Sequence, residues 1–252
     1  MKNNIGIVIQ ARTGSLRLPS KIILPFYKSK SLIELLIEKL QNNFADVPIV
    51  LATSINEKDD ILEKIALQKN VSTYRGSESD VLRRFIDAAD KFSIDRIIRI
   101  CSDNPFLDIE ELKNLIEISK RNSADYISYI VNETPSIKTH FGFWAESVSL
   151  SALKKTAELT ELPLYHEHVT NFVYEHPDLF KIFFIEPACN MSNRKNIRMT
   201  LDTAEDFHLL SEIYSLLVER YDTFGINEIT TFIDNNAHYI DKMTLQIKKN
   251  EK

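Results

Sequence analysis

Apolar residues in the first half of the chain follow two periods in turn. Short runs rich in β-branched residues predict buried strands at 5–9, 48–53, 71–74, 96–101 and 126–131. Between these runs, apolar residues at helical spacing predict helices at 31–42, 57–68, 79–92 and 109–119. This alternation favours an α/β fold in which a mostly parallel sheet carries helices on both faces.

The alternation of strands and helices is less regular between residues 132 and 187. The pattern there predicts helices at 149–160 and 166–175 and a strand at 180–185. A strand at 198–202 then leads into a long helix at 203–219, and a short helix follows at 227–235. We expect the charged end, 246–252, to be frayed. The chain is therefore interpreted as one domain, 1–252, with an excursion at 132–187.

Composition narrows the class of protein. A chain of 252 residues that is 44% hydrophobic can bury a full core. Its 31 basic and 36 acidic residues give a net charge of −5, which does not favour a nucleic-acid partner. The two cysteines indicate neither a disulfide framework nor a zinc site. With no signal-peptide pattern and no apolar stretch of membrane-spanning length, we expect a cytoplasmic protein with no membrane partner.

A small basic segment follows the first strand. Arg12, Arg17 and Lys21 lie within ten residues of one another, with Gly14 and Ser15 in the turn between the arginines. Cations and bare backbone N–H groups at the end of a buried strand suit a polyphosphate ligand. The segment matches neither the GxxxxGK[ST] nor the GxGxxG phosphate motif. Taken alone, a cluster of this kind is usually a solvated basic loop.

Residues 10–21, QARTGSLRLPSK, carry a more specific signal. They resemble the QARxGSxRLPGK signature of cytidylyltransferases that make CMP-activated sugars. The spore coat polysaccharide cytidylyltransferases are the nearest family, and the CMP-Kdo and CMP-sialic acid synthetases are more distant. Serine replaces the usual glycine at Ser20, so we expect a negative φ there. The resemblance implies a Rossmann-like nucleotidyltransferase domain and nucleotide contacts from Gln10, Ala11, Arg12, Gly14, Ser15, Arg17 and Lys21.

Two carboxylates are placed where a metal ion can be held. Asp103 follows the strand at 96–101, and Asp202 ends the strand predicted at 198–202. An aspartate before Pro105 is more commonly a turn or capping residue. However, residues 102–108 and 198–206 resemble the family's GDxPLID and LTVDTPEDF motifs, whose aspartates bind magnesium. Magnesium takes one or two carboxylates together with phosphate oxygens and waters. The resemblance thus implies Mg²⁺ held by Asp103 and Asp202.

The turn at 74–82 leaves two interpretations open. In the related enzymes this position lies beside the base, which implies base contacts from Arg75, Ser77 and Ser79. A simple turn with a capping serine explains the same residues equally well.

The acceptor site is indicated only by resemblance. Gly142 and Glu146 match a family GxxxE pattern, and Glu167 and His168 match an EHVT run. These four residues are assigned to acceptor binding or to a dimer contact, with a structural role left open. Trp144 stands where relatives carry aspartate, a change that bears on which acceptor binds. Residues 166 and 168 of a helix point about 200° apart, which is poor geometry for one metal ion.

The implied reaction is attack by a hydroxyl of a sugar or sugar acid on the α-phosphate of CTP, with release of pyrophosphate. Arg12, Lys21, Asp103 and Asp202 are the expected catalytic residues, and a homodimer is the expected assembly.

Two alternatives remain. A glycosyltransferase consuming a nucleotide sugar usually needs a DxD motif, which the sequence after Asp103 lacks. Intact basic and acidic motifs count against a non-catalytic nucleotide-binding partner in polysaccharide assembly.

Overall fold

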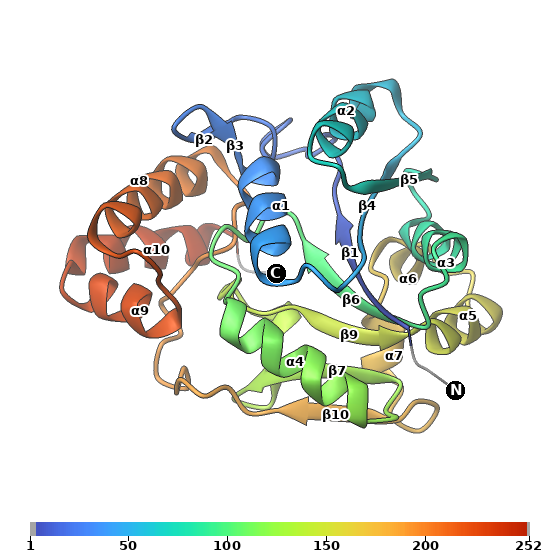
Figure 1. The fold of residues 1–252 in the computed structure, drawn as a ribbon. Helices are drawn as coiled ribbons and strands as arrows, with labels where there is room; N and C mark the ends of the chain where they lie inside the picture. The colour runs from blue at the N-terminus through green and yellow to red at the C-terminus, as the bar shows by residue number, and fades with distance from the viewer. Residues whose placement is uncertain (1–3, 251–252) are drawn as a thin grey trace.

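One mixed sheet runs through the computed structural model, which describes residues 4–250 (Figure 1). The sheet has eight strands, seven of them in the order β10-β7-β9-β6-β1-β4-β5. β1, β4, β5 and β6 are mutually parallel neighbours, and β10 is parallel to β7. Only β9 and the short β8 pair antiparallel with their neighbours. The strands are β1 Ile5–Gln10, β4 Ile49–Ser54, β5 Ser72–Gly76, β6 Arg96–Cys101, β7 Tyr126–Val131, β8 Thr134–Pro135, β9 Glu146–Ser149 and β10 Ile182–Ile185.

Helices cover both faces of this sheet and enclose two hydrophobic cores. Alternate residues of β1 supply both, with Ile7 and Ile9 in the larger core and Val8 in the smaller. The larger core is covered by α1 Leu32–Asn43, α2 Asp60–Gln68, α4 Ile109–Arg121, α8 Ala204–Arg220, α9 Ile226–Asp234 and α10 Ala237–Lys249. The smaller core is covered by α3 Val81–Lys91, α5 Leu150–Leu159 and α7 Asn171–Glu175, with α6 Pro163–Glu167 beside them. The predicted α/β class with helices on both faces is confirmed.

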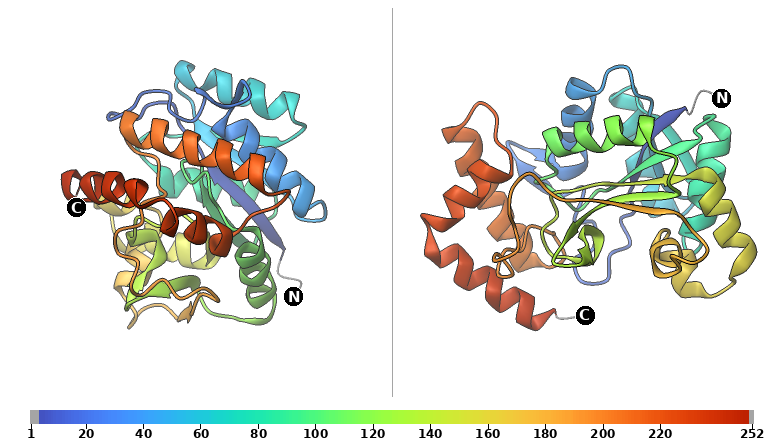
Figure 2. Two further views of the ribbon diagram at one scale, coloured as in Figure 1. Left: turned by 90° about the vertical axis from the view of Figure 1, so that its left-hand side faces the viewer. Right: turned by 90° about the horizontal axis from the view of Figure 1, so that it is seen from below.

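The C-terminal helices form a group of their own. Figures 1 and 2 show α8, α9 and α10 together at one end of the molecule, opposite α3 and α5. A two-stranded ribbon, β2 Pro25–Tyr27 and β3 Lys30–Ser31, lies beside α8, where Phe26 makes an edge contact with Phe207.

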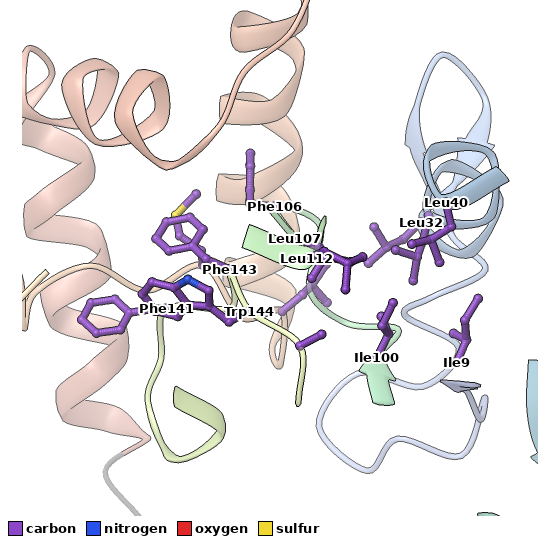
Figure 3. Close-up of a cluster of buried hydrophobic side chains, with 14 of the residues drawn as sticks. Ile9, Leu32, Leu40, Ile100, Phe106, Leu107, Leu112, Phe141, Phe143 and Trp144 are labelled. Carbon is purple, nitrogen blue, oxygen red and sulfur yellow. The ribbon is translucent and has the colours of Figure 1, made fainter. Parts of the chain in front are cut away.

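Aromatic side chains fill the core between the sheet and these C-terminal helices. The side chains of Phe141, Phe143 and Trp144 lie beside one another in Figure 3. Trp144 is 6% exposed and stacks on Tyr129 with ring centroids 5.7 Å apart. Trp144 is therefore a core residue.

Three sequence predictions for the second half were wrong. Residues 198–202 are largely buried but form no strand. Their backbone makes only isolated hydrogen bonds, from Met199 to His140 and from Leu201 to Asp103, instead of a strand ladder. The helix predicted at 166–175 is interrupted at residues 168–170 and forms α6 and α7 instead. The end predicted to be frayed is helical as far as Lys249, and residues 251–252 lie outside the described part.

The predicted excursion at 132–187 contributes three strands to the main sheet, of which the short β8 pairs with β7. β9 lies between β6 and β7, and β10 forms the edge beside β7. This region therefore shares the sheet with the first half of the chain.

Candidate functional site

The basic segment, residues 10–21, begins at the carboxyl end of β1 and is held by hydrogen bonds to a buried aspartate, Asp59. Asp59, 2% exposed, accepts hydrogen bonds from the backbone N–H and the hydroxyl of Thr13, at 2.8 and 2.7 Å. Its other oxygen accepts from the hydroxyl of Ser54. The Thr13 carbonyl in turn accepts from the N–H groups of Ser15 and Ser20, both at 2.9 Å. One buried carboxylate thus holds Thr13, which in turn holds Ser15 and Ser20 of the segment.

Lys21 joins the two predicted metal ligands. Its Nζ lies 2.8 Å from Oδ2 of Asp103 and 3.5 Å from Oδ1 of Asp202, and donates to the Leu201 carbonyl at 2.5 Å. The lysine is nearly buried, and the side chain of Asp103 is the most exposed of the three. The structure therefore brings together three residues that the sequence separates widely.

Asp202 is held by further cations. Arg17 lies 2.6 Å from its Oδ1, and Arg198 lies 2.9 Å from its Oδ2. Burial alone raises the pKa of Asp202, but Lys21, Arg17 and Arg198 outweigh burial and hold the pKa below its usual value. Arg198 also makes a side-on pair with Asp206, which forms a capping box with Thr203 at the start of α8. Asp202 is thus a fixed anion.

Asp202 does not lie at a strand end as predicted. The Leu201 N–H donates to the Asp103 carbonyl at 3.0 Å, which holds the segment against the end of β6. Direct attachment to the Asp103 loop therefore replaces the expected strand ladder.

Ser20 lies in the left-handed region, with φ 60°, so the predicted negative φ is wrong. Its N–H donates to the Thr13 carbonyl, and its carbonyl accepts from the Ile23 N–H at 2.9 Å. These bonds hold the conformation that the usual glycine adopts without strain. Serine is therefore accommodated at a conformational cost.

On the smaller-core side, the start of the basic segment contacts α6 and β6. Arg12 pairs with Glu167 at 3.1 Å across the surface. The side-chain oxygen of Gln10 accepts from both Nε and Nη2 of Arg99, at 3.1 and 2.8 Å. Arg99 also pairs with Glu146. The start of the basic segment is therefore connected to the region predicted to bind the acceptor.

Glu146 does not lie where an acceptor can touch it, which corrects that prediction. It is 2% exposed and accepts hydrogen bonds from Arg99, Tyr126 and Thr170. A carboxylate with these partners supports α7 and Gln10 from inside the protein.

Gly142 also has a packing role. Its φ is +65°, and a Cβ there would lie 2.8 Å from the carbonyl oxygen of Met199. Glycine is needed because residues 198–202 cross directly over it. His168 lies exposed at the end of α6.

The turn after β5 separates the residues predicted to contact the base. Arg75 donates to the carbonyls of Ser54 and Asn56 and pairs with Asp60 and Glu63 of the α2 region. Its guanidinium is thereby occupied, which argues against the predicted base contact. Ser77 and Ser79 lie in the turn itself, where the Ser77 hydroxyl accepts from the Asp80 N–H at 3.0 Å and Asp80 caps α3.

The remaining members of the predicted nucleotide set lie along the segment. Ala11 is buried and donates to the Ala52 carbonyl at 3.2 Å, whereas Gly14 is exposed and Ser15 half-buried. An added Cβ on Gly14 would approach only the Glu78 side chain, at 3.2 Å, so its backbone is open to a ligand.

Asp103 and Asp202 suit a hard divalent cation. Both approach the single ammonium of Lys21, so their oxygens converge on one region of positive charge. Within residues 4–250, no three His, Cys, Asp or Glu side chains form a metal cluster of their own. Two carboxylates are nevertheless enough for magnesium when a triphosphate supplies further oxygens.

Sequence reasoning missed the residues that support this site. Asp59 holds Thr13 although 46 positions separate them, and no local pattern records that contact. Arg198 begins a segment for which the pattern predicts a strand, and that pattern does not indicate its pairs with Asp202 and Asp206. One available signal was the presence of a cation at the start of an otherwise apolar, buried run.

Comparison with known proteins gives a consistent result. Residues 6–241 match a family model described as cytidylyltransferase. The spore coat polysaccharide biosynthesis protein SpsF of Bacillus subtilis is 34% identical over 239 residues, covering 93% of this chain and 95% of that protein. A cytidylyltransferase structure from Leptospira borgpetersenii is 30% identical with a TM-score of 0.82, covering 94% of this chain and 96% of that one. A CMP:2-keto-3-deoxy-manno-octonic acid synthetase complexed with CTP shares the fold, with a TM-score of 0.62, 14% identity and coverage of 86% and 99%.

Proposed function

The chain belongs to the cytidylyltransferase family, and we propose that it transfers CMP from CTP to a sugar or sugar acid with the help of Mg²⁺. In this reaction an acceptor hydroxyl attacks the α-phosphorus. A new phosphorus–oxygen bond forms, the bond from the α-phosphorus to the bridging oxygen breaks, and pyrophosphate leaves. The hydroxyl proton passes to solvent. No covalent intermediate on the protein is required.

The observation that carries this proposal is the convergence of cations and carboxylates at the end of β1. Lys21 contacts Asp103 at 2.8 Å and Arg17 contacts Asp202 at 2.6 Å, while Gly14 stays open nearby. Phosphoryl chemistry is accelerated mainly by fixed positive charge around the phosphates. Lys21 and Arg17 supply that charge, and Arg12 extends it toward α6.

Asp103 and Asp202 are the residues that would hold Mg²⁺ together with phosphate oxygens. When bound, the ion neutralises charge on the triphosphate and on the leaving pyrophosphate. In the structure the ammonium of Lys21 occupies the space between the two carboxylates. A lysine already beside these anions is well placed to turn its charge to the phosphates once another cation neutralises the carboxylates.

The name of the Bacillus relative supports a role in polysaccharide biosynthesis, with a sugar or sugar acid as acceptor. We assign the acceptor to the side of the site formed by Glu167 and His168. The proposed homodimer contact uses the same region, where Leu159, Leu162 and Leu164 are about half exposed. Within the described residues, no helix is long and apolar enough to cross a membrane, and a cytoplasmic location is part of the proposal.

Pyrophosphate release tests the function directly. The purified protein is incubated with CTP, UTP, GTP or ATP and a panel of sugars and sugar acids, with and without Mg²⁺. We expect release with CTP and at least one acceptor, and formation of the matching CMP-sugar by mass spectrometry. Preferential release with another nucleotide would contradict the proposal.

The metal assignment has its own test. Asp103→Asn keeps the shape of the side chain but removes the anion that magnesium prefers, and Asp202→Asn does the same. Each variant is expected to lose most Mg²⁺-dependent turnover while remaining folded by circular dichroism. Asp90→Asn is the matched control, because Asp90 is half exposed and pairs with Lys154 on α5. Wild-type turnover in both site variants would refute the assignment.

A further inference from the structure

A buried arginine fixes the side chain of Gln10 in one orientation. Arg99 donates from both Nε and Nη2 to the side-chain oxygen of Gln10, at 3.1 and 2.8 Å. Because arginine has donors but no acceptor, the amide nitrogen of Gln10 cannot take the place of that oxygen. The amide of Gln10 therefore turns its nitrogen, Nε2, away from Arg99.

The amide nitrogen of Gln10 is left for a ligand. It makes no hydrogen bond among residues 4–250, and Gln10 is only half-buried at the end of β1. The unpartnered nitrogens of Arg84 and Arg96 are closed to solvent, whereas Nε2 of Gln10 is not. A molecule in the site can therefore reach two N–H donors whose direction is fixed before binding.

Glu146 holds Arg99 from its other side. One oxygen of Glu146 pairs with Nη1 of Arg99 and accepts from Thr170 at 2.9 Å, and the second oxygen accepts from Tyr126. Arg99 is 7% exposed, and the other three residues are 2% exposed or less. Of the groups in this network, Gln10 is thus the one that a bound molecule can touch.

The network lies on the side of the site assigned to the acceptor. Gln10, Arg99 and Glu146 belong to the neighbouring strands β1, β6 and β9, and each stands two positions from a smaller-core residue of its own strand (Figure 1). The side chain of Gln10 therefore points toward β6 and α7, away from β4, β5 and the turn after β5. Thr170, which donates to Glu146, caps α7 just after the acceptor residues of α6. The phosphate side lies on the opposite face, where Leu201 belongs to the larger core.

We propose that Gln10 is a specificity-determining residue for the acceptor, and that Arg99 is the positioning residue that orients its amide nitrogen toward an acceptor oxygen; this inference rests on the function proposed above. Hydroxyl and carboxylate oxygens of a sugar or sugar acid both accept from an N–H group. The side chain of Gln10, which resemblance placed among the nucleotide contacts, is thereby assigned to the acceptor. An acceptor without an oxygen at this point leaves the fixed donors unpaired, which is unfavourable.

Gln10→Glu separates this role from a structural one. Glutamate keeps an oxygen for Arg99 and adds a favourable charge, so a merely structural position tolerates it. Its second oxygen replaces the amide nitrogen, so an acceptor oxygen meets another oxygen. With CTP saturating, and with the sugar or sugar acid of the panel that the wild type uses best, the KM for that acceptor is expected to rise about tenfold or more. The dissociation constant for CTP, measured by calorimetry, is expected to change less than about threefold, and the Tm is not expected to fall. Gln68→Glu is the control, because it adds the same charge at the exposed end of α2 and is expected to keep the wild-type KM.

Arg99→Lys tests the positioning role. Lysine keeps a cation beside Glu146 but lacks the rigid fork, so the amide of Gln10 can turn its oxygen outward. The KM for the same acceptor is expected to rise about three- to tenfold with CTP binding retained. In the Gln10→Glu background the change is expected to add little, because both variants remove one interaction.

Four results overturn the inference while the proposed function stands. They are a wild-type acceptor KM in Gln10→Glu, a CTP dissociation constant that rises as much as that KM, a Gln10→Glu variant that no longer folds, and effects of the two substitutions that simply add. Wild-type protein that turns over no member of the panel with CTP removes the proposed function, and this inference with it.

Discussion

Replacing Asp59 by asparagine should destabilise the protein and weaken CTP binding together. Asp59 receives three hydrogen bonds, two from Thr13 and one from Ser54, at a position closed to water. Asparagine keeps one carbonyl oxygen but loses the charge, and its amide nitrogen faces the Ser54 hydroxyl. Hydrogen bonds to a charged group are worth about 1.5–3 kcal/mol, against about 0.5–1.5 kcal/mol for neutral ones. Losing charge assistance in three bonds gives an expected loss of about 2–4 kcal/mol.

The pH dependence of that loss follows from the sign of the pKa shift. Burial raises the pKa of Asp59, but hydrogen bonds from Ser54 and Thr13 outweigh it and leave the pKa below the ordinary value of 3.8. A depressed pKa contributes stability that is present above the unfolded value and is lost as pH falls through the folded value. The difference between wild type and Asp59→Asn should therefore be full at neutral pH and shrink below about pH 4.

Urea unfolding followed by circular dichroism measures this difference. Thr13→Val is the matched variant, because it removes one hydroxyl donor and leaves the backbone N–H bond to Asp59 in place. It should cost about 1 kcal/mol. A loss below about 0.5 kcal/mol in Asp59→Asn, the usual range of surface changes, would refute the reasoning. So would an unchanged KM for CTP, because the segment would then be positioned without Asp59.

Three further outcomes are expected. We propose further that Lys21 contacts the β- and γ-phosphates, so Lys21→Met should weaken CTP binding about ten- to hundredfold by calorimetry but leave CMP binding nearly unchanged; equal effects on both nucleotides would contradict this role. Ser20→Gly should raise stability by about 0.5–1 kcal/mol, seen as a higher Tm, because it relieves the positive φ; a lower Tm would mean that the serine hydroxyl has a separate role. His166 contacts the Thr160 carbonyl and Asp80 through its two ring nitrogens, both at 2.9 Å, and these contacts raise its pKa above 6.5. The contribution of His166 to stability should be full below pH 6.5 and lost as pH rises through the folded pKa, and an NMR titration that gives a lower pKa for His166 in wild type than in Asp80→Asn would oppose this.

The fold of the first half was predictable because the apolar residues of each helix recur at helical spacing and each strand is a short apolar run. β9 was not predicted, since its sequence Glu146–Ser149 is mostly polar and its place in the sheet depends on long-range antiparallel pairing. Residues 198–202 show the opposite case. Their apolar pattern correctly indicates burial, but a strand also needs a neighbouring strand with free backbone groups.

The site was predictable where it depends on motif and topology. Lys21, Asp103 and Asp202 meet as the motifs implied, because Asp103 follows a strand adjacent to the one that precedes Lys21. Glu146 shows where a role cannot be assigned from a family motif. A pattern match gives the residue type but not whether the side chain faces solvent or the interior.

The contact between Lys21 and Leu201 has a consequence for synthesis of the protein. The two residues are 180 positions apart, and the ribosome adds about 5–20 residues per second. The Leu201 carbonyl is therefore added roughly 10–40 s after Lys21, and Asp103 can pair with the lysine earlier. During that time the nascent protein carries an incomplete site, and a polypeptide released before residue 201 never completes it. In the proposed reaction, the site is thus complete only after residues 201 and 202 have been added to the chain.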